Sequence, residues 1–285
     1  MGKLLVTGAT GHLGRQSIEF LITRVPAGSV AALARDPAKA ADLTALGVEV
    51  RQGDYADPAS LERAFAGIDR LLMVSTVMFT DTITHHRNIV AAAKAAGVGH
   101  IVYTGIQRRE GSGFAIDMVT ETDVATEAAL RQSGLDWTLM RNSLYLDSLP
   151  LILGPKVRER GLRVPAGAAV AALGARRDFA EANAAVLTSG GHAGRIYSLG
   201  AGNALSFSGM ARELGVPYAA VDRESFIADR LADGLPPPAA GFLWQWGEAV
   251  ALGEFAEVTG DLERLIGRRP MDAATFLAGA YAAGS

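Results

Sequence analysis

The feature that most constrains the fold is a glycine-rich segment near the start of the chain. It reads Gly8-Ala9-Thr10-Gly11-His12-Leu13-Gly14, follows a candidate strand at residues 3–6, and leads into helical spacing of apolar residues at 12–23. Glycines there let the backbone turn sharply and let a phosphate approach the free amides of a helix N-terminus. The pattern predicts a phosphate-binding turn at these residues; an ordinary glycine-rich strand-to-helix turn is the alternative.

Short apolar or β-branched runs alternate with helical segments as far as residue 141, which is typical of a parallel sheet built from strand–helix–strand units. We expect further strands at 30–34, 48–52, 71–75, 100–104 and 136–140, and helices at 37–46, 82–96 and 120–132. Later helices are expected near 178–188, 207–214, 224–232, 243–252 and 273–283, with short strands at 195–199 and 218–221 and a stiff loop at 235–238.

The predicted fold is therefore α/β: a Rossmann-type, doubly wound parallel sheet with a small, mostly helical C-terminal lobe. We place the nucleotide-binding body at residues 1–150 and a substrate lobe at 151–285, with a strand or helix of the lobe able to return to the body.

Composition excludes several function classes. The formal charge of −3 and the pI near 6.0 do not show the excess of basic residues that is typical of nucleic-acid-binding proteins. The chain has no cysteine, which excludes disulfides, thiolate nucleophiles and cysteine-ligated metals. The most apolar stretch, residues 164–175, is shorter than the roughly 20 residues that a membrane span needs. We expect a cytoplasmic protein that binds neither nucleic acid nor membranes.

Arg35 bears on the choice of nucleotide. Folds that bind NAD commonly carry an acidic residue about 20 residues after the glycines, to hold a ribose hydroxyl. This chain has Ala34-Arg35 there, and Lys39 follows one helical turn later. A guanidinium suits a 2′-phosphate, so the sequence predicts NADP(H) as cofactor. A solvated surface arginine is the alternative.

Polar residues follow three of the expected strands, at the edge where parallel sheets bind ligands. Asp54 and Tyr55 follow the third strand, Ser75 and Thr76 the fourth, and Thr104 and Gly105 the fifth. We expect them to contact the cofactor, with Thr104 also a reserve hydrogen-bond donor at the reacting centre. A helix-entry turn is the alternative for Asp54 and Tyr55, and plain strand-end turns are the alternative for the other two pairs.

A tyrosine followed four positions later by a lysine carries the acid chemistry of ordinary short-chain dehydrogenases. Four positions after its six tyrosines, this chain instead has Ala59, Gln107, Leu149, Ala201, Asp222 and Ser285. Reduction of an isolated ketone through such a pair is excluded, unless another residue replaces it. Quinones and cationic dyes need little acid help, because hydride leaves a delocalised or neutralised product.

Several segments, taken in order, resemble the NmrA-like atypical short-chain dehydrogenases, and especially the type 2 NAD(P)H:quinone oxidoreductases and the triphenylmethane reductases. These segments are GATGHLG, ALARDPAKA, VRQGDY, HRNIVAAAKAAGV, HIVYTG, LMRN, GHAGRIYSLG and GDLERLIG. The resemblance implies a Rossmann body with a small C-terminal lobe, cofactor binding by residues 8–14 and Arg35, and Asn142 and Tyr145 facing the substrate. A loop asparagine and a packed tyrosine are the alternative for that last pair. Two positions depart from the family, since Asp123 stands where close relatives carry histidine and Gly105 where many carry serine.

These features predict an NADPH-dependent reductase that transfers hydride to quinones or similar conjugated acceptors, with Asn142, Tyr145 and Thr104 as catalytic candidates. The alternative is a non-catalytic NADP(H)-binding redox sensor of the NmrA-like type. A homodimer is compatible with both. His85-His86, with only Asp81 at helical spacing, falls short of a full ligand set, so no metal is expected.

Overall fold

The computed structural model describes residues 2–76 and 81–282. The chain forms two compact units, each assembled from separate stretches. The sheet unit consists of Met1–Ile106, Met118–Arg141 and Arg176–Tyr197, and the helical unit of Gln107–Asp117, Asn142–Ala175 and Ser198–Ser285. The chain therefore passes between the two units several times.

A seven-stranded sheet runs in the order β3-β2-β1-β4-β5-β6-β8. Its strands are β1 (Leu4–Val6), β2 (Val30–Ala34), β3 (Glu49–Gln52), β4 (Arg70–Val74), β5 (His100–Ile106), β6 (Asp136–Asn142) and β8 (Arg195–Leu199). β1 pairs in parallel with both β2 and β4, and Leu5 lies opposite Ala31 on one side and Leu71 on the other. The strand order reverses between β1 and β4, which is the switch point where such sheets bind ligands. The predicted doubly wound Rossmann fold is confirmed.

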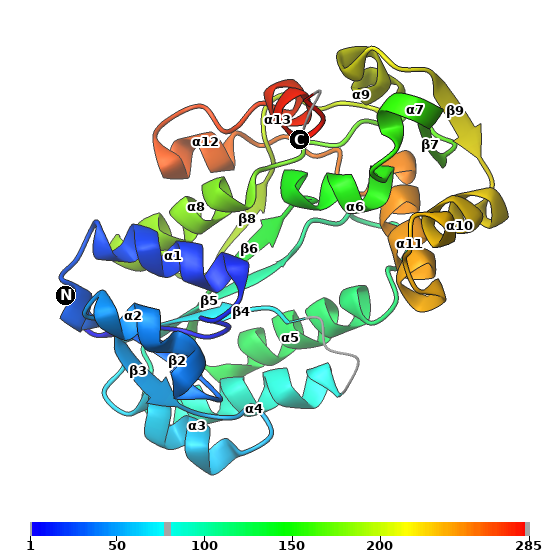
Figure 1. The fold of residues 1–285 in the computed structure, drawn as a ribbon. Helices are drawn as coiled ribbons and strands as arrows, with labels where there is room; N and C mark the ends of the chain where they lie inside the picture. The colour runs from blue at the N-terminus through cyan, green and yellow to red at the C-terminus, as the bar shows by residue number, and fades with distance from the viewer. Residues whose placement is uncertain (1, 77–80, 283–285) are drawn as a thin grey trace. The chain divides into compact units, whose positions relative to one another are not determined.

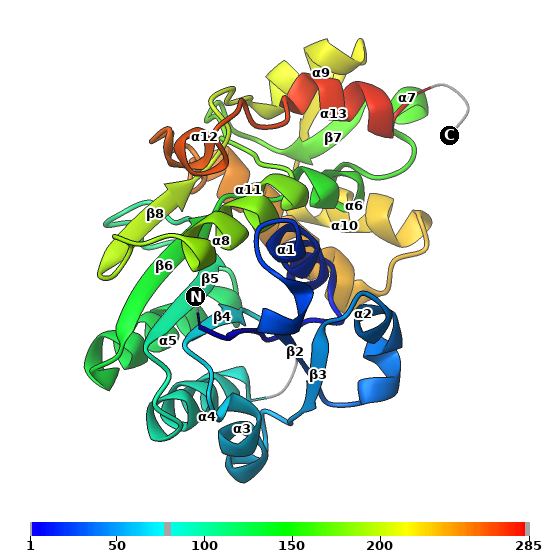
Figure 2. The same cartoon turned by 90° about the vertical axis from the view of Figure 1, so that its left-hand side faces the viewer.

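Helices cover both faces of this sheet. In Figures 1 and 2, α1 (His12–Ile22) and α8 (Arg176–Thr188) lie on one face, and α3 (Pro58–Phe65), α4 (Thr82–Ala95) and α5 (Val119–Ser133) lie on the other. The core on the second face includes Phe65, Leu71, Ile101 and Leu130, which are almost fully buried. Burying a side chain of this size contributes about 1.5–3 kcal/mol.

α8 packs along α1 although more than 150 residues separate them in sequence. The contact includes a buried polar link, because Asn183 Nδ2 donates to Ser17 Oγ at 3.2 Å and that hydroxyl donates to Leu13 O at 2.8 Å. This link holds the helix that begins at the glycine-rich segment.

The single helix expected at residues 37–46 is in fact two short ones, a 3₁₀ helix η2 (Pro37–Ala40) and α2 (Ala41–Ala45). Asp36 caps the first by accepting the Ala38 N–H at 3.1 Å, and Pro37 starts it, as the sequence indicates. The backbone then turns at Ala40, which is fully buried, before the second helix begins. Another 3₁₀ turn, η1 (Ala27–Ser29), precedes β2.

The second unit consists mostly of helices, as expected for the C-terminal lobe. Its elements are η3 (Leu146–Ser148), α6 (Leu149–Leu153), α7 (Val157–Arg160), β7 (Leu162–Pro165), α9 (Phe207–Leu214), β9 (Tyr218–Val221), α10 (Arg223–Ala232), α11 (Pro237–Leu252), α12 (Asp261–Ile266) and α13 (Ala273–Ala280). The strands β7 and β9 form a parallel two-stranded sheet. The prolines expected in a stiff loop instead begin α11, because Pro236 is its N-cap and Pro237 opens its first turn. Over residues 2–76 and 81–282, no helix is long and apolar enough to cross a membrane.

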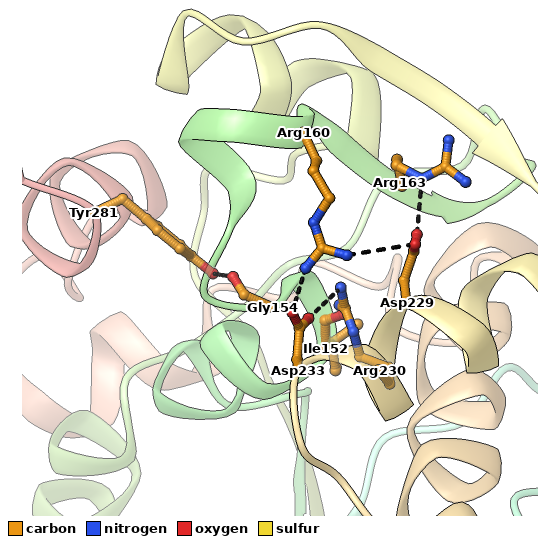
Figure 3. Close-up of polar contacts among 8 residues, drawn as sticks. All are labelled: Ile152, Gly154, Arg160, Arg163, Asp229, Arg230, Asp233 and Tyr281. Carbon is orange, nitrogen blue, oxygen red and sulfur yellow. Dashed lines mark hydrogen bonds and ion pairs between the residues drawn. The ribbon is translucent and has the colours of Figure 1, made fainter.

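An ionic cluster ties the parts of the helical unit together (Figure 3). Arg230 on α10 is only 3% exposed; its guanidinium donates to Ile152 O at 2.7 Å and pairs with Asp233 at 3.0 Å. Asp233 also pairs with Arg160 on α7, which in turn reaches Asp229 at 3.4 Å. The buried charges are therefore matched across α6, α7 and α10.

Gly154, which follows α6, belongs to the same cluster. Its φ is +88°, and a Cβ built on it would lie 2.4 Å from Arg230 Nη2. The Tyr281 hydroxyl donates to Gly154 O at 3.1 Å, which brings the end of the described chain onto α6 (Figure 3). Only glycine leaves room for the arginine here.

Candidate functional site

The glycine-rich segment connects β1 to α1 at the carboxyl edge of the sheet. The Gly11 N–H donates to Gly8 O at 2.9 Å, and the first helical bond runs from the Arg15 N–H to Gly11 O at 3.0 Å. The N–H groups of His12, Leu13 and Gly14 belong to the first turn of α1, before that first helical bond. Such first-turn N–H groups have no acceptor within their own helix. Together with the helix dipole, these amides favour an anion.

The three glycines of this segment meet different steric demands. Gly8 has φ +60°, a conformation that other residues rarely adopt. A Cβ on Gly14 would lie 2.3 Å from Gly8 O, so glycine is needed there for α1 to approach the turn. Gly11 has an ordinary φ of −86°, and its Cβ would meet only Gly8 O, at 3.3 Å. Gly11 is also exposed, so its lack of a side chain leaves room for a phosphate beside the backbone.

Tyr55 holds this turn from the neighbouring loop. Its hydroxyl accepts the Gly8 N–H at 2.9 Å, and its carbonyl accepts from Asn88 Nδ2 at 2.9 Å. Burial raises the pKa of this phenol, so it stays protonated. The Gly8 amide is thus already bonded, and Tyr55 positions the glycine turn through it.

Asp54 takes part in the turn that enters α3. Its carboxylate accepts the Ala56 N–H at 3.0 Å, and its own N–H donates to Ser60 Oγ at 2.9 Å. These bonds account for the residue as part of a helix entry, which was the alternative that the sequence left open. Its contact with a cofactor stays a prediction.

Arg35 and Lys39 lie beyond the end of β2, and both are exposed. The backbone of Arg35 is held by Gln52, whose Nε2 donates to Arg35 O at 3.3 Å. A third cation, Arg15 on α1, pairs with Asp42 on α2 and was not singled out by sequence reasoning. The expected contact between Arg35 and a 2′-phosphate fits this position, on the β2 side of the glycine turn.

On the other side of the turn, the ends of β4 and β5 are joined through their hydroxyl residues. The Ser75 N–H donates to Thr104 Oγ1 at 3.0 Å, so the structure brings these two predicted residues together. Thr104 is 3% exposed and Gly105 is buried, while Ser75 and Thr76 are half-buried. The Thr76 hydroxyl finds no hydrogen-bond partner among residues 2–76 and 81–282.

A buried tyrosine–aspartate pair lies behind these strand ends. The Tyr103 hydroxyl donates to Asp123 Oδ1 at 2.5 Å and lies 3.3 Å from Ser75 Oγ. The other carboxylate oxygen, Asp123 Oδ2, accepts the Ile106 N–H at 2.6 Å. Burial and the Asp123 charge together hold the pKa of Tyr103 well above its ordinary value.

Sequence reasoning missed Tyr103 and noted Asp123 only as a departure from relatives. The available signal was a tyrosine that follows two apolar residues within a predicted buried strand, HIVYT. The two departures prove to be neighbours, because a Cβ on Gly105 would lie 2.9 Å from Asp123 Oδ2. A side chain at position 105 and the carboxylate of Asp123 therefore compete for the same space.

His86 on α4 completes this buried polar region. Its Nδ1 lies 2.8 Å from Thr126 Oγ1, and because that hydroxyl already donates to Thr122 O at 2.7 Å, we assign the ring proton to Nδ1. The imidazole meets the Tyr103 ring edge-on, with 5.8 Å between centroids. Burial, with a smaller effect from His85, lowers the pKa of His86 to about 4, so the ring is neutral near pH 7.

Two catalytic candidates lie in the helical unit. Asn142 is 1% exposed, and its Nδ2 donates to the Tyr145 hydroxyl at 3.0 Å, so the structure brings this predicted pair together. The Gln107 N–H donates to Asn142 O at 2.7 Å, and Gln107 Nε2 donates to Ser198 Oγ at 2.8 Å. Sequence reasoning missed Gln107 and Ser198, which only the fold brings beside Asn142.

Asn142 Oδ1 and Gln107 Oε1 are buried without a hydrogen-bond partner in the described part of the chain. Within that same part, no group of three or more histidine, aspartate or glutamate side chains could hold a metal ion.

Comparison with known proteins agrees with this geometry. Residues 8–189 match the NAD(P)H-binding family. Quinone oxidoreductase 2 of Escherichia coli (strain K12) is 35% identical over 271 residues, which is 93% of each chain. The crystal structure of triphenylmethane reductase from Citrobacter sp., complexed with NADP(H), superposes with a TM-score of 0.89 at 33% identity, covering 98% of this chain and 99% of that one. The NADPH-dependent quinone oxidoreductase of Escherichia coli, complexed with NADPH, superposes with a TM-score of 0.88 at 34% identity and the same coverage.

These matches confirm the resemblance drawn from GATGHLG and the segments after it, and with it a nicotinamide dinucleotide as the cofactor. The glycine turn, the exposed Gly11 and the first amides of α1 fit such a group. The chain therefore belongs to the NAD(P)H-binding family and, within it, to the NmrA-like oxidoreductases.

Proposed function

We propose that this protein is an NADPH-dependent reductase that transfers hydride to quinones or similar conjugated acceptors, without a Tyr/Lys catalytic pair. Its relatives support the reductase assignment over nearly the whole chain, and one of them is named for quinones. The observation that carries the choice of acceptor is the state of Tyr103, which is bound to Asp123 and kept protonated.

The cofactor supplies a hydride when it is bound; this chain's residues hold it. The amides of His12, Leu13 and Gly14 receive the pyrophosphate, and Gly11 gives it room. Arg35, with Lys39 nearby, receives the 2′-phosphate that distinguishes NADPH from NADH. β2 ends at Ala34 and is followed by Arg35, and the carboxylate of the next residue, Asp36, is used to cap η2 through the Ala38 N–H.

The choice of acceptor class rests on Tyr103, the buried phenol at the strand ends, being a poor proton donor. Hydride addition to a simple ketone makes an alkoxide, which is costly in a low-dielectric site unless an acid protonates it. Tyr103 is a poor acid because its pKa is raised by burial and by the Asp123 charge. A quinone delocalises the new charge until the oxygen takes a proton from water, so hydride and proton together give the hydroquinone.

Asn142 and Tyr145 are our candidates for contacting the acceptor. The resemblance to the family suggests this role. The hydrogen bond of 3.0 Å between Asn142 Nδ2 and the Tyr145 hydroxyl supports the role, because it fixes the orientation of the amide and of the phenol. We expect Asn142→Ala to lower kcat by misplacing the acceptor, and Tyr145→Ala mainly to raise KM by removing a binding surface. Tyr145→Phe separates the two contributions, since it keeps the ring and removes only the hydroxyl.

The test is steady-state NADPH oxidation with one quinone, one cationic dye and one simple ketone, each corrected for the rate without enzyme. Turnover of the quinone with negligible turnover of the ketone supports the proposal. Robust ketone reduction would show that an acid is present after all. Tight NADPH binding with no turnover of any acceptor would favour a redox sensor.

A further inference from the structure

Asp123 is a buried carboxylate on α5 that is bonded to the strand β5. The side chain is 1% exposed, and its two oxygens accept from Tyr103 Oη at 2.5 Å and from the Ile106 N–H at 2.6 Å. Two donated hydrogen bonds favour the ionised form of a carboxyl group. Both donors belong to the last residues of β5, and the Asp123 charge is one cause of the raised pKa of Tyr103.

The register of the sheet places this charge at the carboxyl edge. Val74, the last residue of β4, lies opposite Thr104, so Ser75 and Gly105 follow at the same level. A Cβ at Gly105 would lie 2.9 Å from Asp123 Oδ2, so the carboxylate stands directly beside the backbone at that level. Glycine at position 105 keeps a side chain from pushing the charge away.

The direction of a bound dinucleotide follows from the residues already described and rests on the proposed function. The pyrophosphate lies at the turn after β1, and Arg35 marks the adenosine half on the β2 side. The nicotinamide half then extends over the ends of β4 and β5, across the switch point. Asp123 is therefore behind the half of the cofactor whose charge changes in the reaction.

We propose that the Asp123 carboxylate stabilises the oxidised nicotinamide ring relative to the reduced ring, and so makes the bound cofactor a stronger hydride donor. The ring is uncharged when reduced and cationic when oxidised. A fixed negative charge in a water-poor site attracts the cation and leaves the neutral ring almost unaffected. Asp123 acts on the ring electrostatically, without touching the reacting atoms, so it is a positioning residue and not a catalytic one.

The experiment compares dissociation constants of NADP⁺ and NADPH, measured by calorimetry, for the parent protein and Asp123→Asn. The asparagine keeps the shape and one acceptor oxygen but removes the charge. We expect NADP⁺ to bind about tenfold more weakly to the variant, with NADPH affinity within about twofold of the parent. The ratio of the NADP⁺ dissociation constant to the NADPH dissociation constant would then be about tenfold higher in the variant. Such an increase raises the reduction potential of the bound two-electron couple by about 30 mV.

Asp69→Asn is the matched control. Asp69 is a carboxylate of the same unit at the opposite, amino edge of the sheet, where its Oδ2 accepts the Lys3 N–H at 2.5 Å. The five residues of β4 lie between Asp69 and Ser75, so the two are six steps apart, roughly 20 Å at about 3.3 Å per residue. The same substitution there should leave the NADP⁺ to NADPH ratio unchanged.

The outcomes separate the inference from the proposed function. Equal changes in both affinities, or none, for Asp123→Asn would overturn the inference, as would an equal shift from Asp69→Asn. If Asp123→Asn does not fold, Asp123→Ser, also uncharged, is measured and judged by the same ratio. A parent protein that binds neither form overturns the proposed function and the inference with it. Normal binding and the expected ratio without quinone turnover overturn the proposed function alone.

Discussion

The backbone of Gly14 faces the carbonyl oxygen of Gly8 so closely that a Cβ at Gly14 would lie 2.3 Å from that oxygen. Gly11, between them, meets the same oxygen only at 3.3 Å. The same substitution at the two positions should therefore have different effects, one on the fold and the other on the ligand.

We predict that Gly14→Ala lowers the free energy of unfolding by about 1–3 kcal/mol, the usual cost of an overpacked position. Gly11→Ala should unfold within about 1 kcal/mol of the parent but bind NADPH at least tenfold more weakly, because the methyl group occupies the space of the pyrophosphate. Urea unfolding and calorimetry measure the two effects. Normal NADPH binding by a folded Gly11→Ala protein would contradict the phosphate assignment.

The second prediction concerns Arg35, whose exposed side chain lies beyond β2. Arg35→Ala should weaken NADPH binding roughly ten- to a hundredfold, the usual loss for a charge-assisted hydrogen bond, and leave NADH binding unchanged. Lys94→Ala, which removes a cation from the last turn of α4, is the control and should change neither. Equal affinity of the parent for NADPH and NADH would refute the assignment.

The third prediction is a pH dependence of stability that arises from His86. Its pKa is lowered from 6.5 to about 4 in the fold, chiefly by burial, whereas the unfolded chain takes up the proton near 6.5. The unfolded state therefore binds more protons between these values, so stability is full above pH 6.5 and falls as the pH drops towards 4, by about 3 kcal/mol.

Urea unfolding at a series of pH values measures this effect as the difference between the parent and His86→Gln. In His86→Gln, the unfolding free energy should lose the pH dependence between pH 6.5 and 4 that His86 causes. His12→Gln, which changes an exposed histidine, should keep the pH dependence of the parent. An identical slope in the parent and in His86→Gln would show that the imidazole is not held neutral.

The fourth prediction tests the ionic cluster of the helical unit. Asp233 accepts from Arg160 and lies 3.0 Å from the buried Arg230, so Asp233→Asn leaves a buried guanidinium without its counter-charge. We expect a loss of about 3–5 kcal/mol in unfolding free energy. Glu224→Gln, at an exposed position of the same helix, should change it by no more than about 0.5 kcal/mol. A loss below 1 kcal/mol for Asp233→Asn would mean that the cluster is effectively solvated.

Local patterns were enough to predict much of the sheet unit. The strand Val30–Ala34 and the helix start at His12 agree with the structure, because a buried apolar run and a glycine turn act within a few residues. The hydrogen bond between Asn142 and Tyr145 is local as well, since the two are three residues apart, but the pair was singled out by the resemblance to the family and not by a local pattern.

Contacts made by packing could not be predicted in this way. Tyr103 meets Asp123 only because α5 folds back onto β5, and nothing in either segment alone indicates the other. The short elements α6, α7 and β7 are specified by their neighbours in the helical unit, such as the guanidinium of Arg230 beside Gly154, more than by their own few residues.

The most direct test of the central claim is a single-turnover measurement. Protein loaded with a stoichiometric amount of NADPH is mixed rapidly with excess benzoquinone, and the loss of NADPH absorbance is followed against the same mixture without protein. We predict a fast enzyme-dependent loss of absorbance with one hydroquinone formed per NADPH. A rate equal to that of free NADPH, at concentrations where binding is saturated, would contradict the assignment of this protein as a quinone reductase.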